Sequence, residues 1–323
     1  MLIYKYVSGF NADVIHAHMA YPAGFLSTYA SKKLKIPLII TPQGADVQVN
    51  PEINYGLALN EKLAKKISFA LENANAIGTI SRSIRNTLFN MGLAKDKLYE
   101  IPNGVDVESF RKNFSNEELG EISNEYGLSK FDKIILSAGR NHPKKGFNVL
   151  IDAVAKLVGE GLNVGCVIVG KDTEKLCPRV ESLGITGNVI LIGQIPAVKE
   201  KRFSLDSIPS PKLLKLFKLS DIFVLPSLIE GFSLVVLEAM AAGLSIIVSD
   251  VEGCRDVIKN GVTGLLMKPG DPDDLAGKIR NILESRDIGL RFKRNSTAEL
   301  KKYDWEYISR KYMRLYNDLT YRK

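Results

Sequence analysis

Two glutamates, Glu230 and Glu238, lie eight residues apart in the segment PSLIEGFSLVVLEAMAAGLSIIVSD, residues 226–250. The pattern predicts a buried parallel strand before Glu230, then a helix over 232–242, then a second strand at 245–249. Glu238 would lie about two turns into an otherwise apolar helix. An unpaired charge is costly there, so this carboxylate needs a polar partner, and a ribose diol is one candidate.

The loop around Glu230 leaves the carboxyl end of a predicted strand, where open α/β sheets bind their ligands. Gly231 allows the backbone to approach another group closely. The amides of Phe232, Ser233 and Leu234 are predicted to be unpaired donors at the helix N-terminus, which is a natural anion site. The alternative is an ordinary α/β unit with two surface acids.

A second candidate lies in GRNHPKKGFNVLIDAVAKL, residues 139–157, where a predicted strand ends and a helix begins near Gly146. Arg140 and Lys145 flank this turn, at the same sheet edge as the Glu230 loop. A guanidinium and an ammonium both suit phosphate oxygens, and fixed cations stabilise a departing pyrophosphate. The alternative is a solvated basic loop.

A pair of histidines, His16 and His18, falls on one face of a predicted strand by period-two alternation. A metal site would need further ligands, and His142 is the only other histidine in the chain. A metal site is therefore not expected here, and a structural role for the histidines, for His16 above all, is the alternative to any function of the pair.

These segments together resemble the signature of retaining glycosyltransferases of the GT-B fold, in the large family 4. The family has a Glu, seven residues and a second Glu, a GR…KG element, and an HxH element after a first-domain strand. The resemblance implies that Glu230 contacts the sugar and that Glu238 holds the ribose of a nucleotide-sugar. It also implies that Arg140 and Lys145 bind the diphosphate and that His18 faces the reacting sugar.

Two further segments resemble the family with departures. TPQGADV, residues 41–47, carries Gln43 where His is common, and Gln can hydrogen-bond but cannot act as an acid or base. Asp46 in that loop is interpreted as loop-shaping or as a cap. The second segment is GCRDVIKNGVTGLLMKPGD, residues 253–271, in which Asp256 stands where Glu is usual. This segment supports the fold more than the chemistry.

The resemblance implies transfer of a sugar from a nucleoside-diphosphate sugar to a glycan, lipid or small-molecule acceptor. The resemblance also implies front-face attack, in which the leaving phosphate helps to take the acceptor's proton and neither a side-chain base nor a metal is needed. We therefore expect no metal and no cofactor. His18 and Glu230 are placed at the reacting sugar. The alternatives are a nucleotide-sugar-binding fragment or split subunit without turnover, and a GT-B phosphorylase or epimerase.

Composition fits a globular chain of 323 residues with a net charge of +8. No apolar run reaches the ~18 residues of a membrane span, no signal peptide is visible, and the three cysteines form no paired framework. We expect a cytoplasmic protein. The basic amphipathic stretch 211–220 favours a packed surface helix, with peripheral contact at the inner face of the membrane as the alternative. No nucleic-acid motif accompanies the charge, so no nucleic-acid partner is expected.

Strand-like runs alternate with helix-length segments, which predicts α/β architecture with two Rossmann-like doubly wound domains of the GT-B type. We expect a partial acceptor-side domain at 1–108, a connection at 109–132 and a donor-binding domain at 133–290. Helices over 291–323 are expected to cross back onto the first domain. The family normally begins with earlier βα units, which are not visible here, so the first domain is expected to be incomplete.

Overall fold

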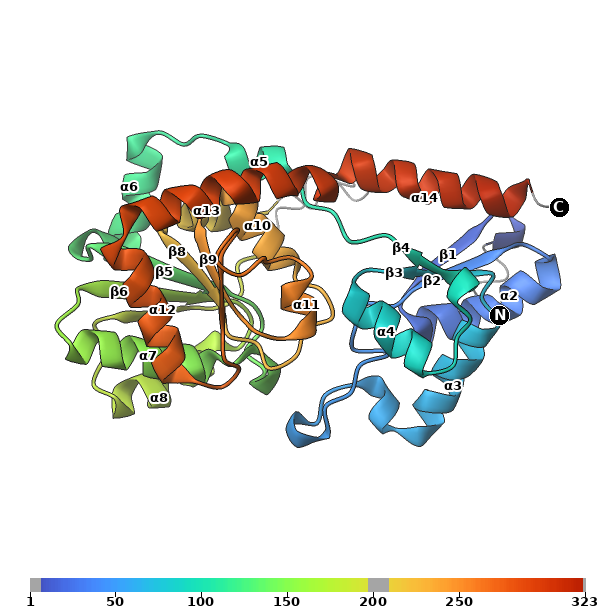
Figure 1. Ribbon diagram of the computed structural model, residues 1–323, viewed down its shortest axis with the longest axis horizontal. Coiled ribbons are helices and arrows are strands. Elements are labelled where there is room, and N and C mark those ends of the chain that lie inside the picture. Colours follow the sequence, from blue (N-terminus) through green and yellow to red (C-terminus); the bar gives the residue numbers. More distant parts are fainter. Residues whose placement is uncertain (1–6, 197–208, 322–323) are drawn as a thin grey trace. The chain divides into compact units, whose positions relative to one another are not determined.

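The computed structural model describes residues 7–196 and 209–321, and these residues form two compact units. The first unit comprises the residues up to Gly104, the segment Ile229–Phe232 and the residues from Trp305 onward. The second unit comprises Val105–Leu228 and Ser233–Asp304. Each unit is a parallel sheet covered by helices (Figure 1). The predicted α/β class is therefore confirmed.

The first unit is built on four parallel strands in the order β1-β2-β3-β4. Their bounds are β1 Ile15–His18, β2 Leu38–Thr41, β3 Ala76–Thr79 and β4 Leu98–Glu100. Helices α2 and α3 cover one face of this sheet with α4, and α14 covers the other. The bounds of these helices are α2 Phe25–Leu34, α3 Glu61–Glu72, α4 Arg82–Asn90 and α14 Trp305–Thr320.

Alternation along the strands explains the two-faced burial of this sheet. Leu38 and Ile40 point to the cluster under α2 and α3, whereas Ile39 between them points to the cluster formed with α14. Successive side chains of a strand alternate between faces, and a strand covered on both faces is apolar throughout. Ser81 caps α4, because its hydroxyl accepts from the N–H of Ile84 at 3.1 Å.

The second unit contains six parallel strands in the order β10-β9-β8-β5-β6-β7. Their bounds are β5 Lys133–Ala138, β6 Val164–Val169, β7 Val189–Ile192, β8 Ile222–Leu225, β9 Ser245–Ser249 and β10 Leu265–Met267. The strands predicted before Gly146, before Glu230 and at 245–249 correspond to β5, β8 and β9. The order reverses between β5 and β8, because the chain adds β6 and β7 on one side of β5 and then crosses to add β8, β9 and β10 on the other.

Nine helices accompany this sheet in the described part of the chain. Their bounds are α5 Val107–Arg111, α6 Asn116–Glu125, α7 Phe147–Gly159, α8 Cys177–Ser182, α9 Pro211–Leu219, α10 Leu234–Ala242, α11 Glu252–Arg255, α12 Pro272–Glu284 and α13 Arg286–Glu299. Short 3-10 turns also occur, of which Pro143–Lys145 bears on the site. Pro272 occupies the first turn of α12, and Asp271 caps this helix through the N–H groups of Asp273 and Asp274.

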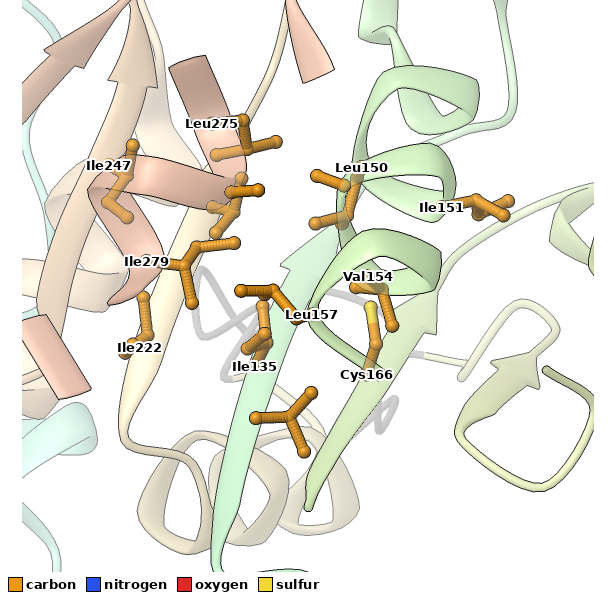
Figure 2. Close-up of a cluster of buried hydrophobic side chains, with 14 of the residues drawn as sticks. Ile135, Leu150, Ile151, Val154, Leu157, Cys166, Ile222, Ile247, Leu275 and Ile279 are labelled. Carbon is orange, nitrogen blue, oxygen red and sulfur yellow. The ribbon is translucent and has the colours of Figure 1, made fainter. Parts of the chain in front are cut away.

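The core of the second unit lies between the sheet and the helices α7 and α12 (Figure 2). Leu150, Val154 and Leu157 of α7 meet Ile279 of α12 over Ile135 of β5, and all five side chains are almost fully buried. Burial of each such side chain is worth about 1.5–3 kcal/mol. This core gives the strand ends beside it a rigid support.

Helix α9 is a packed surface helix, which the sequence favoured over a membrane-contacting one. Lys212 pairs with Glu125 of α6 at 2.6 Å, and Lys215 lies 3.7 Å from Glu118 of the same helix. On its apolar side, Phe217 stacks on Phe223 of β8 with ring centroids 5.9 Å apart. In the described part of the chain, every helix is too short or too polar to cross a lipid bilayer.

Candidate functional site

The carboxyl ends of β5 and β8 are adjacent, and the strand order reverses between these two strands. Open α/β sheets bind ligands in the crevice at such a switch point, because the two connecting loops diverge there. The chain leaving β5 carries Arg140 and Lys145, and the chain leaving β8 leads through Glu230 to Glu238. The sequence predicted one common sheet edge for both segments, and the structure adds that their strands are neighbours.

A backbone hydrogen bond joins the loop after β5 to the chain after β8. The N–H of Leu228 donates to the carbonyl of Lys144 at 2.7 Å. Gly146 makes this approach possible: its φ is +64°, and a Cβ there would lie 2.0 Å from the carbonyl oxygen of Pro226. Only glycine tolerates both the backbone angle and the contact. The basic loop is therefore fixed beside the segment that leads to α10.

The loop after β5 carries a concentrated positive charge. The aliphatic chain of Lys145 folds back toward the end of β5, with its Cε 3.4 Å from the Cβ position of Gly139. The pKa of His142 is lowered by its partial burial and then by the charges of Arg140, Lys144 and Lys145. His142 shapes the loop, because its Nδ1 accepts from the N–H of Lys144 at 3.1 Å.

Helix α10 begins at Leu234, two residues later than predicted, so Phe232 lies outside the helix. The reason is packing: Phe232 contacts the apolar cluster of the first unit, and Ser233 is extended, with φ −110° and ψ 100°. Ser233 occupies the N-cap position, yet its hydroxyl accepts no hydrogen bond from the first turn and is buried without a partner among the described residues. The N-terminus of α10 therefore keeps donors available for an anion.

Glu238 lies in the second turn of α10, and its carboxyl group makes no ion pair within the described part of the chain. Burial raises the pKa of this carboxyl from 4.5 to about 7. The carboxyl thus resembles the unsatisfied acid that the sequence predicted, and it is available to accept hydrogen bonds from a polar ligand.

Glu230 is buried and belongs to the first unit with the rest of Ile229–Phe232. Its carbonyl oxygen lies 3.4 Å from Nε2 of Gln48. A Cβ on Gly231 would lie 3.1 Å from the Cα of Gly44 and 3.0 Å from Oε1 of Gln48. The role predicted for Gly231, a close backbone approach, is thus seen, and Gly44 and Gln48 are its neighbours within the first unit.

His16 and His18 lie on one face of β1, as predicted, with ring centroids 4.5 Å apart. His16 is engaged on both nitrogens, by Tyr316 of α14 at Nδ1 and by Thr41 of β2 at Nε2, each at 2.8 Å. Burial lowers the pKa of His16 to about 4, and the charge of His18 contributes. His16 is thus held neutral, as a structural residue would be. His18 is more exposed, and burial lowers its pKa less.

Gln43 orients His18. Its Nε2 lies 3.4 Å from Nδ1 of His18, and its Oε1 accepts from Asn103 Nδ2 at 3.3 Å. An amide nitrogen only donates, so Nδ1 of His18 accepts and the ring proton lies on Nε2. Asp46 fixes the surrounding loops, because its carboxylate accepts from the N–H groups of Ala20 at 2.6 Å and Gln43 at 2.9 Å.

The contacts of three of these residues, Tyr316, Gln48 and Asn103, could not be predicted from the sequence. Tyr316 lies 300 residues from its partner His16, and nothing in the local pattern signals the contact. Gln48 is a single polar residue without a motif. Asn103 lies in the turn-like segment IPNGVD, residues 101–106, but nothing in that segment signals its contact with Gln43. The C-terminal segment is rich in aromatic residues, but nothing in the sequence shows which strand they cover.

Comparison with known proteins places both halves of the chain in one class. The profile described as glycosyl transferases group 1 matches residues 120–299, more than half of the chain, and the glycosyltransferase family 4 profile matches residues 1–109. An uncharacterised glycosyltransferase of Methanocaldococcus jannaschii is 31% identical over 247 residues, which cover 74% of this chain and 58% of that protein. The match thus spans less than two thirds of that relative's length.

Other relatives are more distant in sequence. The N-acetyl-alpha-D-glucosaminyl L-malate synthase of Bacillus anthracis is 25% identical over 314 residues, 96% of this chain and 75% of that protein. The crystal structure of the Anabaena protein HepE in complex with UDP aligns with a TM-score of 0.81 at 19% identity, over 98% of this chain and 81% of the other. That likeness shows the fold: two Rossmann-like domains.

Proposed function

Because the chain belongs to the glycosyl transferases group 1 family, we propose that it transfers a sugar from a nucleoside-diphosphate sugar to an acceptor hydroxyl, with retention at the anomeric carbon. The acceptor class that we propose is a glycan, a lipid or a small molecule. The observation that supports this most directly is the hydrogen bond between Leu228 and Lys144, which fixes a basic loop beside the segment that leads to α10.

In this proposal the diphosphate of the donor is bound by Arg140, Lys145 and the N–H groups at the start of α10. Negative charge develops on the diphosphate as the bond from the anomeric carbon to phosphate oxygen breaks. Fixed cations and a helix N-terminus stabilise that charge without reorganisation. The site therefore has its own source of positive charge, and the proposed reaction requires no metal ion.

The ribose and the sugar are assigned to carboxylates. Glu238 accepts hydrogen bonds from the ribose diol, which offsets the cost of its burial. Glu230 is proposed to bind hydroxyl groups of the sugar, and His18 to position the reacting sugar through its Nε2–H. The new bond forms on the face that the leaving group vacates, and the acceptor's proton passes to the departing phosphate oxygen.

The test is donor binding followed by product analysis. Thermal shift against UDP, GDP, ADP and their sugar conjugates would identify the base, and UDP is the first choice because HepE was crystallised with it. A ligand that binds only the folded state raises stability by about 2.7 kcal/mol at a hundredfold excess over its Kd. Mass spectrometry of glycan, lipid and small-molecule acceptors incubated with the binding donor would then detect transfer.

Two variants assign the diphosphate site. Lys145→Ala is expected to weaken nucleoside-diphosphate binding roughly tenfold or more, as loss of a charge-assisted hydrogen bond implies. Lys144→Ala is the matched control. It removes a neighbouring lysine side chain but keeps the backbone carbonyl that accepts the hydrogen bond from Leu228. Equal losses in both variants would argue against a specific role for Lys145. Donor binding without any transferred product would favour a binding subunit over an enzyme.

A further inference from the structure

A cavity of about 580 Å³ lies at the amino-terminal ends of strands in the second unit's sheet, whereas the proposed donor site lies at their carboxyl ends. Its wall includes the first residue of three strands: Lys133 of β5, Ile222 of β8 and Ser245 of β9. The proposed donor site lies instead at the carboxyl ends of β5 and β8. The two sites are therefore separated by the length of the strands, and the proposed function leaves this cavity unexplained.

Positive charge gathers at this cavity. Lys293 of α13 lines it, and a Cβ on Gly243 would lie 2.7 Å from Cε of Lys293, so the glycine makes room for the lysine chain. Lys218 of α9 lies near enough that the charge of Lys293, after burial, lowers the pKa of Lys218. Within the described residues, neither ammonium is paired with a carboxylate. An anion bound here would relieve the repulsion between the two lysines.

The acid that lines the cavity is already neutralised. Asp221 binds Nζ of Lys133 at 2.6 Å, and its second oxygen accepts from the N–H of Ile134 at 2.9 Å. Asp287, in the first turn of α13, is exposed to solvent. The lining thus keeps a net positive charge from Lys293.

Unused hydrogen-bond donors point to the same place. Ser245 is more than nine-tenths buried, lines the cavity, and its hydroxyl bonds to no other described residue. Ser285 also lines the cavity and is the N-cap of α13, a helix of 14 residues, but its side chain makes no capping hydrogen bond. The N–H of Ile288 in the first turn bonds the carbonyl of Ser285 at 3.2 Å. The start of α13 therefore presents the positive end of its dipole, without a side-chain cap, beside Ser245 and Lys293.

The rest of the wall is apolar and comes from Ile282, Leu283 and Leu290. A cavity of this volume is within the range of small-molecule sites, which combine an apolar wall with a few convergent polar groups. We propose that this cavity binds a phosphate monoester that carries an apolar group. The phosphate would contact Lys293, Ser245 and the start of α13, and the apolar group would lie against the leucines.

Phenyl phosphate is a probe with both features, and its binding can be measured by calorimetry and thermal shift. We expect it to bind and stabilise the whole chain, whereas phenol should not bind and inorganic phosphate should bind more weakly. Lys293→Gln should weaken phenyl phosphate roughly tenfold or more, and the matched control Lys301→Gln, an exposed lysine outside the cavity, should not. Lys145→Ala separates the sites: it should weaken nucleoside diphosphates but leave phenyl phosphate binding unchanged.

A second variant tests the position without removing a charge. Gly289 lines the cavity inside α13, and a Cβ there would lie 3.0 Å from Oγ of Ser245. Alanine is the better helix former, so Gly289→Ala should fold at least as stably and still weaken phenyl phosphate by narrowing the cavity.

The proposal is overturned if phenyl phosphate fails to stabilise the protein, binds no better than inorganic phosphate, or binds Lys293→Gln and Gly289→Ala as well as the unaltered chain. Vesicles of phosphatidylcholine with and without phosphatidic acid identify the source of the ester. Binding that needs both phosphatidic acid and Lys293 would support a lipid ester, and phenyl phosphate binding without vesicle binding would support a soluble one.

Discussion

At the scale of single residues, the protonation state of Glu238 links stability to ligand binding. Its pKa is raised by burial from 4.5 to about 7, so the folded chain favours the protonated acid. The stability contributed by burying the neutral Glu238 side chain is therefore fully present below pH 4.5. The free energy of unfolding then falls as the pH rises from 4.5 through about 7, because the folded chain must bury a charge. Glu238→Gln, which cannot ionise, should be about 1–3 kcal/mol more stable than the unaltered chain at pH 8 and equally stable at pH 4.

The same variant should bind donor less well. A ribose diol donates hydrogen bonds to the ionised carboxylate, so affinity in the unaltered chain should rise from pH 6 to pH 8. In Glu238→Gln the affinity should be lower and independent of pH across that range. Chemical denaturation and calorimetry at pH 4, 6 and 8 measure both effects. A pH slope that survives in the variant would assign the titration to another group.

The hydrogen bond from Leu228 to Lys144, which links the two loops, depends on Gly146. Gly146→Ala places a methyl group 2.0 Å from the carbonyl of Pro226 and adds a side chain at φ +64°. We expect a loss of about 2 kcal/mol or more in the free energy of unfolding, together with weaker nucleoside-diphosphate binding.

The control for this substitution is Gly161→Ala. Gly161 also has a positive φ, +86°, but a Cβ there would meet nothing within 4 Å. Gly161→Ala should therefore lower the free energy of unfolding only by the backbone strain, about 1–2 kcal/mol, and leave ligand binding intact. If the two variants lose stability and binding equally, the contact with Pro226 is not what fixes the basic loop.

At the scale of elements, α14 is attached to the first unit's sheet by a polar contact within an apolar cluster. Tyr316 bonds His16, while Ile308 and Leu315 of the same helix are buried against the sheet. Tyr316→Phe should lower the free energy of unfolding by about 1 kcal/mol, because it leaves the half-buried Nδ1 of His16 without its partner. Tyr307→Phe, at an exposed position of α14, should have no measurable effect on thermal stability.

The elements themselves could largely be predicted from the sequence, but their neighbours could not. Apolar runs bounded by turn residues located the strands, since period and composition are local properties. The adjacency of β5 and β8 and the contact of Tyr316 with His16 depend on packing between distant segments. The start of α10 was predicted two residues early because Phe232, which fits a helix locally, packs instead into the first unit's apolar cluster.

Some residues of the candidate site could likewise be predicted from the sequence, and others could not. Arg140, Lys145 and Glu238 could be proposed because their residue types and spacing carry a chemical meaning. From the sequence, Gln43 could be recognised only as a departure from a family pattern. The structure shows that its side chain contacts Nδ1 of His18. The cavity beside Lys293 was not predicted, because its wall combines strand starts and helix residues that are far apart in the sequence.

At the scale of the whole molecule, most residues proposed to bind the nucleoside diphosphate lie in the second unit, whereas Ile229–Phe232 lies in the first. Residues 105–304 contain all of the second unit's strands together with this segment, and they should fold as a piece on the core under α7 and α12. We expect this piece to bind the nucleoside diphosphate within about threefold of the whole chain's Kd, since Arg140, Lys145 and α10 are retained.

The intact sugar donor should distinguish the piece from the whole chain. Glu230 and Gly231 contact Gln48 and Gly44, which the piece lacks, so the loop that is proposed to bind the sugar loses its neighbours. The gain in affinity from adding the sugar to the diphosphate should therefore shrink in the piece. Calorimetry with UDP and UDP-glucose on both proteins measures this gain directly. An unchanged gain would mean that the sugar is bound without Glu230 in its observed setting, and a piece that folds but binds no UDP would move the diphosphate site out of the second unit.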